Sequence, residues 1–194
     1  AASPDEPAAP VPGAGGRAAL YVPRMLQQHL VADPGAQSWI AEGTAAFADI
    51  SGFTKLSEQL ASKGREGAEQ IAEVIGRSFE AILSVAYDAG GSLLKFGGDA
   101  LLLWFEGDGH LARACQATIE MRAKLGIVGR ISLPGAEVVL QMSQGVHSGP
   151  FHFFAVGTSH VEFLPTGPGW TRLVAMETEA TAGEILLTPE AARA

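Results

Sequence analysis

The order of apolar and polar residues predicts a chain of alternating helices and strands. Between residues 66 and 88, apolar side chains recur every three or four positions, which is the period of a helix with one buried face. Shorter runs, such as 44–50 and 100–105, are largely apolar and have the length of buried strands. Glycine pairs at 90–91 and 97–98 interrupt the pattern, as turns do.

The same pattern assigns the remaining elements. We expect a short helix within 20–40, a helix capped by Thr54, and further helices over 66–88, 111–125 and 171–180. Strands are expected over 44–50, 92–96, 100–105, 138–147, 151–156, 161–164 and 183–187. This order predicts a ferredoxin-like α+β fold, an antiparallel-rich sheet with helices packed on one face.

Length and composition predict one folded domain. A chain of 194 residues with 47% hydrophobic and 18% charged residues can bury one full core. Residues 1–19 are rich in alanine, proline and glycine, and we expect them to form a disordered lead or linker before a domain over 20–194. The first residue is alanine, and the chain stops inside an expected helix after Pro189, so we expect a fragment of a longer protein.

Charge and cysteine usage narrow the partners and the compartment. The formal net charge of −8 argues against nucleic-acid binding. A single cysteine excludes a disulfide framework and favours a reducing, cytoplasmic setting. The apolar run 100–105 is far too short to cross a membrane, and no signal peptide is visible, so no membrane segment is expected in this chain.

Two aspartates carry most of the candidate chemistry. Asp49 and Asp99 each lie in an apolar, strand-like run beside glycine, and we expect both to be buried. A buried carboxylate is costly unless a cation or several donors meet it. Asp49 could instead cap the next helix and Asp99 could merely occupy a turn, but the matched pair favours a shared site for two Mg²⁺ or Mn²⁺ ions.

The residues after Asp49 predict a phosphate-binding turn. Ser51, Gly52, Phe53 and Thr54 connect a strand to a helix, where backbone N–H groups and the helix dipole favour an anion. Lys95 precedes Asp99 by four residues, and strand alternation predicts that both lie on the same face. A ligand bound to the aspartates could therefore contact Lys95.

The segments 47–54 and 94–100 together resemble the catalytic domain of class III adenylyl and guanylyl cyclases. Residues 144–150 look like that family's strand ending in a His-Ser/Thr-Gly turn, and 183–188 look like its closing strand. The resemblance covers about residues 43–190, and within the family the chain looks most similar to the bicarbonate-responsive soluble adenylyl cyclases and their bacterial relatives.

The resemblance implies a reaction and a partner. Such domains pair head to tail as homo- or heterodimers, and ATP binds at the interface. One partner supplies the two metal-binding aspartates, here Asp49 and Asp99, with the Ile50 carbonyl as a further ligand. The 3′-hydroxyl of ATP then attacks the α-phosphorus, and 3′,5′-cyclic AMP and pyrophosphate form. The sequence leaves open whether ATP or GTP is preferred.

One family feature is missing from this chain. The asparagine and arginine that stabilise the family's transition state fall at Thr171 and Ala175, counted back from the closing strand. Loss of one such donor typically costs about 10²–10³ in rate, so the isolated domain is expected to be weak or inactive. The chain therefore resembles the metal-bearing half of an asymmetric pair. Trp170 either fills the vacated half-site or only packs there.

Two cations have a second implied role. In the bicarbonate-responsive relatives, a lysine and an arginine bind the anion in the degenerate half-site, and Lys95 and Arg172 match them in position. The alternative is that Lys95 remains from an ancestral purine pocket and Arg172 is a surface residue. If the bicarbonate role holds, both should face one pocket.

The sequence leaves three alternative functions open. The first is a cyclase half that is catalytic when paired, and the second is a regulatory pseudo-cyclase that binds nucleotide or bicarbonate. The third is a diguanylate-cyclase-like enzyme, because Gly97-Gly98-Asp99 is similar to that family's hairpin, although Ala100 and Leu101 replace its acidic and aromatic residues. The metal pair favours the first.

Overall fold

A computed structural model of the chain describes residues 22–133, 135–157 and 161–194. The helices are α1 (Arg24–Ala32), α2 (Phe53–Leu60), η2 (Ala61–Lys63), α3 (Arg65–Asp88), α4 (His110–Val128), α5 (Pro168–Glu179) and η3 (Ala191–Arg193). The strands are β1 (Ser38–Ser51), β2 (Ser92–Gly97), β3 (Ala100–Phe105), β4 (Arg130–Leu133), β5 (Ala136–Val139), β6 (Gln141–Val156), β7 (Glu162–Thr166) and β8 (Ile185–Leu187). The predicted lead at 1–19 lies outside the described residues.

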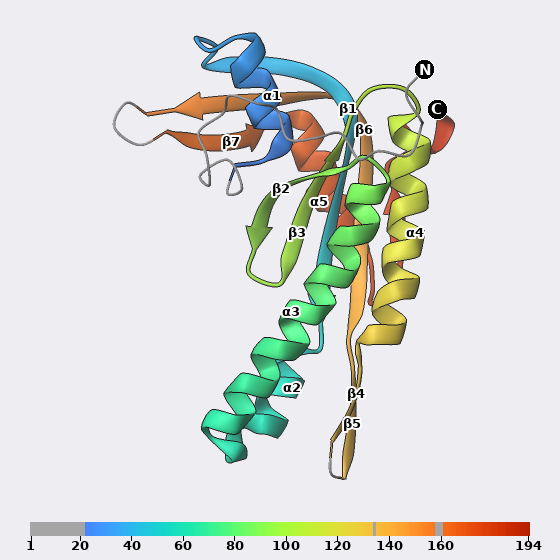
Figure 1. Cartoon of the computed structure of the whole chain (residues 1–194). Coiled ribbons are helices and arrows are strands. Elements are labelled where there is room, and N and C mark those ends of the chain that lie inside the picture. The colour runs from blue at the N-terminus through green and yellow to red at the C-terminus, as the bar shows by residue number, and fades with distance from the viewer. Residues whose placement is uncertain (1–21, 134, 158–160) are drawn as a thin grey trace, which may run out of the picture.

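The main sheet has six strands and is almost entirely antiparallel. Its order is β2-β3-β1-β6-β7, and β8 adds to β6 as a parallel partner. Strand β6 is long enough to pair with β8 along its first half and with β7 along its second half. A separate hairpin, β4–β5, extends with α2 and the start of α3 beyond the lower end of the sheet (Figure 1). The predicted antiparallel-rich α+β fold is confirmed.

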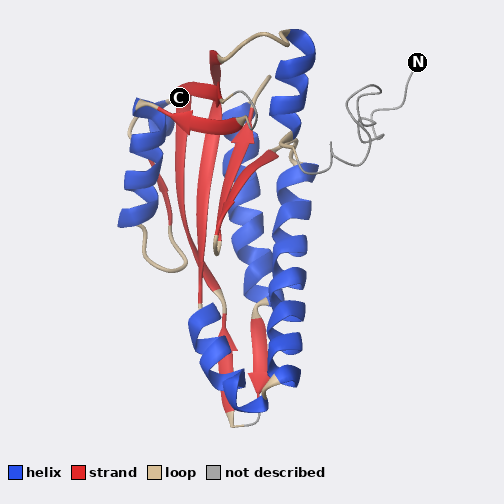
Figure 2. Cartoon of the chain, turned by 90° about the vertical axis from the view of Figure 1, so that its left-hand side faces the viewer, coloured by secondary structure: helices blue, strands red, loops and turns tan. Residues whose placement is uncertain are grey.

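Helices cover both faces of the sheet, so the expectation of helices on one face is wrong. Helices α3 and α4 pack together on one side, and α5 packs on β6 from the other (Figure 2). The reason is that residues on β1, β3 and β6 are apolar on both sides of the strand, which leaves two faces to bury.

Each face has its own core. The larger core lies under α3 and α4 and includes Ile50, Leu101 and Val146 from the central strands. The second core is mainly aromatic, with Trp104, Phe151, Phe153 and Trp170 in mutual ring contact, and α1 contributes Met25 to it. Aromatic side chains bury large areas, so this cluster fixes the start of α5 against the sheet.

Several strand boundaries differ from the sequence prediction. Strand β1 begins at Ser38 instead of residue 44, inside the range expected to be helical, because it pairs with the second half of β6. The runs 138–147 and 151–156 belong largely to one strand, β6, which continues through Gly149 and Pro150. The sequence reading also missed β4 and the separate hairpin strand β5. In each case pairing with a distant segment decides the outcome.

The described residues contain no helix that is both long and apolar enough to cross a membrane.

Candidate active site

Asp49 lies near the end of β1, on the face of the sheet that carries the aromatic core. Side chains alternate along a strand, and Ala45 and Phe47 both contact that core, so Asp49 points to the same side. Its side chain is half-buried. Burial raises the pKa of the Asp49 carboxyl, and the negative charge of Asp99 raises it further. A cation at this position would relieve both effects.

Asp99 lies beside Asp49 because β3 pairs with β1. Gly98 and Asp99 form the two-residue turn between β2 and β3, and the φ of 73° at Gly98 suits such a hairpin. The next residue, Ala100, is the direct partner of Asp49, and the Ile50 N–H donates to the Asp99 carbonyl at 3.3 Å. The structure therefore brings the two aspartates to one end of the sheet.

The expectation that both aspartates are buried is wrong for Asp99. Its side chain is exposed, because a two-residue turn at the tip of a hairpin extends beyond the packed part of the sheet. The unfavourable desolvation therefore falls on Asp49. Asp99 contributes mainly by its charge and by its closeness to β1.

The turn between β1 and α2 has the expected residues but a different cap. Gly52, not Thr54, is the N-cap of α2, and Thr54 is the second residue of the helix. Gly52 has a φ of +107°, and a Cβ there would lie 3.0 Å from the Val139 carbonyl oxygen. Gly52 offers no side chain to the first N–H groups of α2, which leaves these donors for another partner. Ser51 is the last residue of β1.

A third carboxylate near Asp49 was missed in the sequence. Ser143 on β6 is the direct partner of Asp49, and its hydroxyl donates to Glu177 Oε1 at 3.1 Å. Burial raises the pKa of Glu177, the Ser143 hydrogen bond lowers it, and the Asp49 charge raises it. Glu177 lies one helical turn after the buried Leu173 of α5, which the sequence could have shown. Only the packing of α5 on β6 brings Glu177 to the Asp49 end of the sheet.

Lys95 lies on β2 beside a β-bulge between Leu93 and Lys95, so simple alternation does not describe this strand. Lys95 pairs with Leu102, whose side chain contacts the aromatic core, which places Lys95 on the face of Asp49. Its Nζ forms an exposed ion pair with Glu162 Oε1 at 3.2 Å. From Lys95 to Gly97 the pairing with β3 is regular, and only the two-residue turn ends the expected alternation before Asp99.

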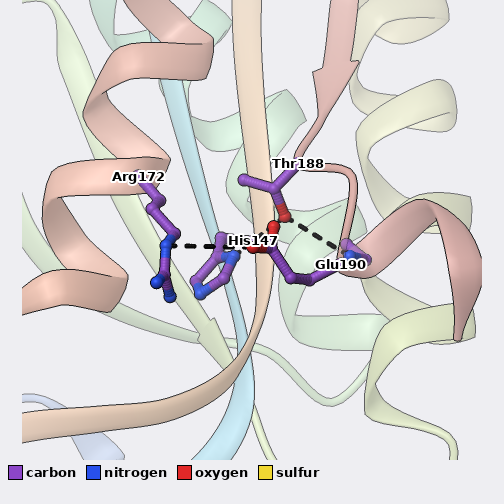
Figure 3. A network of polar contacts seen from close by, with 5 residues as sticks. His147, Arg172, Thr188 and Glu190 are labelled. Carbon is purple, nitrogen blue, oxygen red and sulfur yellow. Dashed lines mark hydrogen bonds and ion pairs between the residues drawn. The ribbon is translucent and has the colours of Figure 1, made fainter.

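Arg172 lies on the exposed side of α5 and is engaged elsewhere. Its Nε is 3.9 Å from Glu190 Oε1, at the C-terminal end of the chain (Figure 3). His147 of β6 lies beside this ion pair, and its Nδ1 is 2.8 Å from Thr188 Oγ1 (Figure 3). Arg172 and Lys95 thus contact different carboxylates, and their common anion pocket stays a prediction.

Thr171 and Ala175, where the sequence resemblance places the family's transition-state pair, lie on α5. Thr171 and Ala175 are both exposed and one helical turn apart, and the Thr171 hydroxyl donates to the Gly167 carbonyl. Trp170 is buried, and its indole N–H donates to the His152 carbonyl at 3.1 Å. Trp170 therefore packs in the aromatic core.

The donor set at the end of β1 fits a divalent cation. Carboxylate and carbonyl oxygens, as offered by Asp49, Asp99 and Ile50, are the ligands that Mg²⁺ and Mn²⁺ prefer. Within the described residues, no group of three or more His, Cys, Asp or Glu side chains is arranged to hold a metal. A cation here would therefore draw further ligands from the backbone, water or a bound phosphate.

Comparison with solved structures shows which fold the chain shares. Among solved structures, the adenylyl cyclase CyaB from P. aeruginosa superimposes with a TM-score of 0.67 at 24% identity, over 81% of this chain and 82% of that one. A bacterial light-regulated adenylyl cyclase gives a TM-score of 0.69 at 16% identity, over 91% of this chain and 51% of that one. The fold is that of a class III cyclase catalytic domain.

Sequence similarity agrees with this cyclase fold. Adenylate cyclase type 10 of Homo sapiens is 29% identical over 154 residues, which are 76% of this chain and 9% of the human protein. The same-named protein of Rattus norvegicus is 42% identical over 66 residues, 32% of this chain and 4% of that one. The chain thus spans less than a tenth of these relatives, and no family model matches it. The predicted resemblance to class III cyclases is confirmed.

Proposed function

We propose that this chain is the metal-bearing half of a class III nucleotidyl cyclase that converts ATP into 3′,5′-cyclic AMP and pyrophosphate. The observation that carries the proposal is the convergence of Asp49 and Asp99 through the pairing of β1 with β3. Solved adenylyl and guanylyl cyclases superimpose on 81% of this chain, and the sequence relatives are adenylate cyclases.

In this proposal the end of β1 binds the reacting phosphates. Asp49, Asp99 and the Ile50 carbonyl would hold two Mg²⁺ or Mn²⁺ ions. When bound, such ions polarise phosphoryl oxygens, activate an attacking hydroxyl and neutralise departing phosphates. The uncapped N–H groups at the start of α2, after Ser51 and Gly52, would orient the phosphate chain by hydrogen bonds.

A second cyclase domain would complete the site. Thr171 and Ala175 offer neither the amide nor the guanidinium that stabilises the family's transition state. A complementary domain, paired head to tail, would supply both groups at the aspartate end of this chain. The isolated chain should accordingly have weak activity, because removing such donors costs about 10²–10³ in rate each.

The test supplies the missing pair on this chain itself. The double variant T171N/A175R places both groups one turn apart on the exposed side of α5, so that a homodimer would carry complete sites. We expect cyclic nucleotide formation with Mn²⁺ and ATP to rise by about 10²-fold or more over the parent chain. Parallel assays with GTP would establish the base preference.

The matched control adds D49N to that double variant. Asparagine keeps the shape of Asp49 but removes the charge, so activity should return to the level of a blank. Activity that survives D49N would show that the metal assignment is wrong. A double variant that is no more active than the parent would contradict the positions assigned to the missing pair.

The second candidate is a regulatory pseudo-cyclase that binds nucleotide or bicarbonate through Lys95 and Arg172. Both cations lie in exposed ion pairs with separate carboxylates, Glu162 and Glu190, and this gives the candidate less support. Bicarbonate titration of the paired enzyme, with K95A and R172A as variants, distinguishes the two. Equal stimulation of all three proteins would exclude the anion role.

A further inference from the structure

Helix α5 approaches β6 unusually closely beside the candidate site. A Cβ on Gly145 would lie 2.6 Å from the Glu177 backbone nitrogen and 2.7 Å from the Leu173 carbonyl oxygen. Only glycine permits this approach, since the neighbouring atoms belong to the helix backbone. The contact fixes where the last turn of α5 lies over the sheet, and with it the position of Glu177.

The Glu177 side chain is held next to Asp49 without contacting it in a hydrogen bond. Ser143 bonds Glu177 at 3.1 Å, and Ser143 is the direct cross-strand partner of Asp49. Cross-strand partners have their Cβ atoms about 4.5–5.5 Å apart on the same face. Glu177 is therefore held through one intervening side chain from the first aspartate.

The charges of the three carboxylates influence one another. The Asp99 charge acts on Asp49, and the Asp49 charge acts on Glu177, in a partly buried setting where screening by water is incomplete. No lysine or arginine is among the groups that shift either carboxyl. A divalent cation bound by Asp49 and Asp99 would be attracted by Glu177 even without bonding to it.

We propose that Glu177 is a positioning residue for the metal-binding end: held by Ser143, it adds a third negative charge behind Asp49 and so tightens cation binding. This inference rests on the proposed function, because it assumes that Asp49 and Asp99 bind the cation. It assigns α5 of this chain a role in its own metal site, in addition to the exposed positions Thr171 and Ala175.

The test measures cation binding directly and needs no catalysis. Free Mn²⁺ is quantified by its paramagnetic resonance signal during titration of the full 194-residue chain at constant ionic strength. E177Q removes the charge but keeps an oxygen that can accept the Ser143 hydrogen bond, so the fold should be preserved. We expect Mn²⁺ binding to weaken by roughly three- to tenfold, as for loss of one charge near a divalent ion in a partly screened setting.

Three further variants complete the design. E179Q removes the same charge from an exposed position two residues along α5, and it should change the affinity by less than about twofold. S143A releases Glu177 while keeping its charge, and it should give a loss smaller than that of E177Q. D49N should abolish binding, and circular dichroism melting checks that every variant is folded.

The outcomes distinguish a failed role for Glu177 from a failed metal site. If D49N abolishes binding while E177Q and E179Q have equal effects, the role of Glu177 is refuted and the metal site stands. If the parent chain does not bind Mn²⁺, or D49N binds it as well as the parent does, the proposed metal site itself is refuted. An S143A variant with parental affinity would remove Ser143 from the inference.

Discussion

Replacing Gly145 with alanine should loosen α5 from the sheet. The added Cβ would lie 2.6 Å from the Glu177 nitrogen, 2.7 Å from the Leu173 oxygen and 3.1 Å from the Met176 Cβ. Ordinary contacts between such atoms begin near 3.4 Å, and two of the three neighbours are backbone atoms that cannot rotate away. The helix must therefore shift by several tenths of an ångström over its whole contact with β6.

The size of the effect follows from overpacking in a buried place. Inserting one methyl group into a tightly packed contact typically costs about 1–3 kcal/mol. With a urea dependence of about 2 kcal/mol per molar, the midpoint of unfolding should fall by about 0.5–1.5 M. Equilibrium urea unfolding, followed by far-UV circular dichroism, measures this shift. Because the same move displaces Glu177, Mn²⁺ affinity should fall as well.

A matched glycine on α3 provides the control. Gly76 is exposed in the helix interior, and a Cβ there would meet nothing within 4 Å. G76A should stabilise the chain by about 0.5–1 kcal/mol, since alanine has the higher helix propensity. The two Gly→Ala changes should therefore have opposite signs. A G145A variant as stable as the parent would refute the close packing of α5 on β6.

Two further predictions concern buried polar groups. The Ser78 hydroxyl on α3 is fully buried and lacks a hydrogen-bond partner within the described structure. In urea unfolding, S78A should therefore leave the free energy of unfolding unchanged or raise it by up to about 1 kcal/mol. A clear loss of stability would reveal a hydrogen bond to the hydroxyl. Burial lowers the pKa of His147, and the Arg172 charge lowers it further, although Glu190 and Glu42 raise it. Because the unfolded chain then binds the proton more readily, stability should be lost as pH falls below about 6.5 toward the folded-state pKa. H147Q should flatten this dependence between pH 7.5 and 5.5, and an unchanged slope would contradict the assignment.

The local pattern of apolar and polar residues was sufficient to predict the long helix α3, the β2–β3 hairpin and the aspartate pair. The apolar period over 66–88 predicted the long helix α3, and the glycine pair 97–98 before Asp99 predicted the turn of the β2–β3 hairpin. These features depend on neighbours in the chain, whose spacing the sequence displays directly. The same is true of Asp49, since a charged residue in an apolar strand is visible without a structure.

Features that depend on distant segments were decided only by the tertiary structure. The early start of β1 at Ser38 follows from its pairing with the second half of β6, and the exposure of Asp99 follows from its place at the hairpin tip. Glu177 became part of the site because Gly145 lets α5 approach β6, which places the carboxylate beside Ser143. The sequence alone identified Asp49 and Asp99 as residues that could carry the chemistry. The packing of α5 on the sheet decided that Glu177 joins them, because contacts between segments far apart in the chain leave no local period to read.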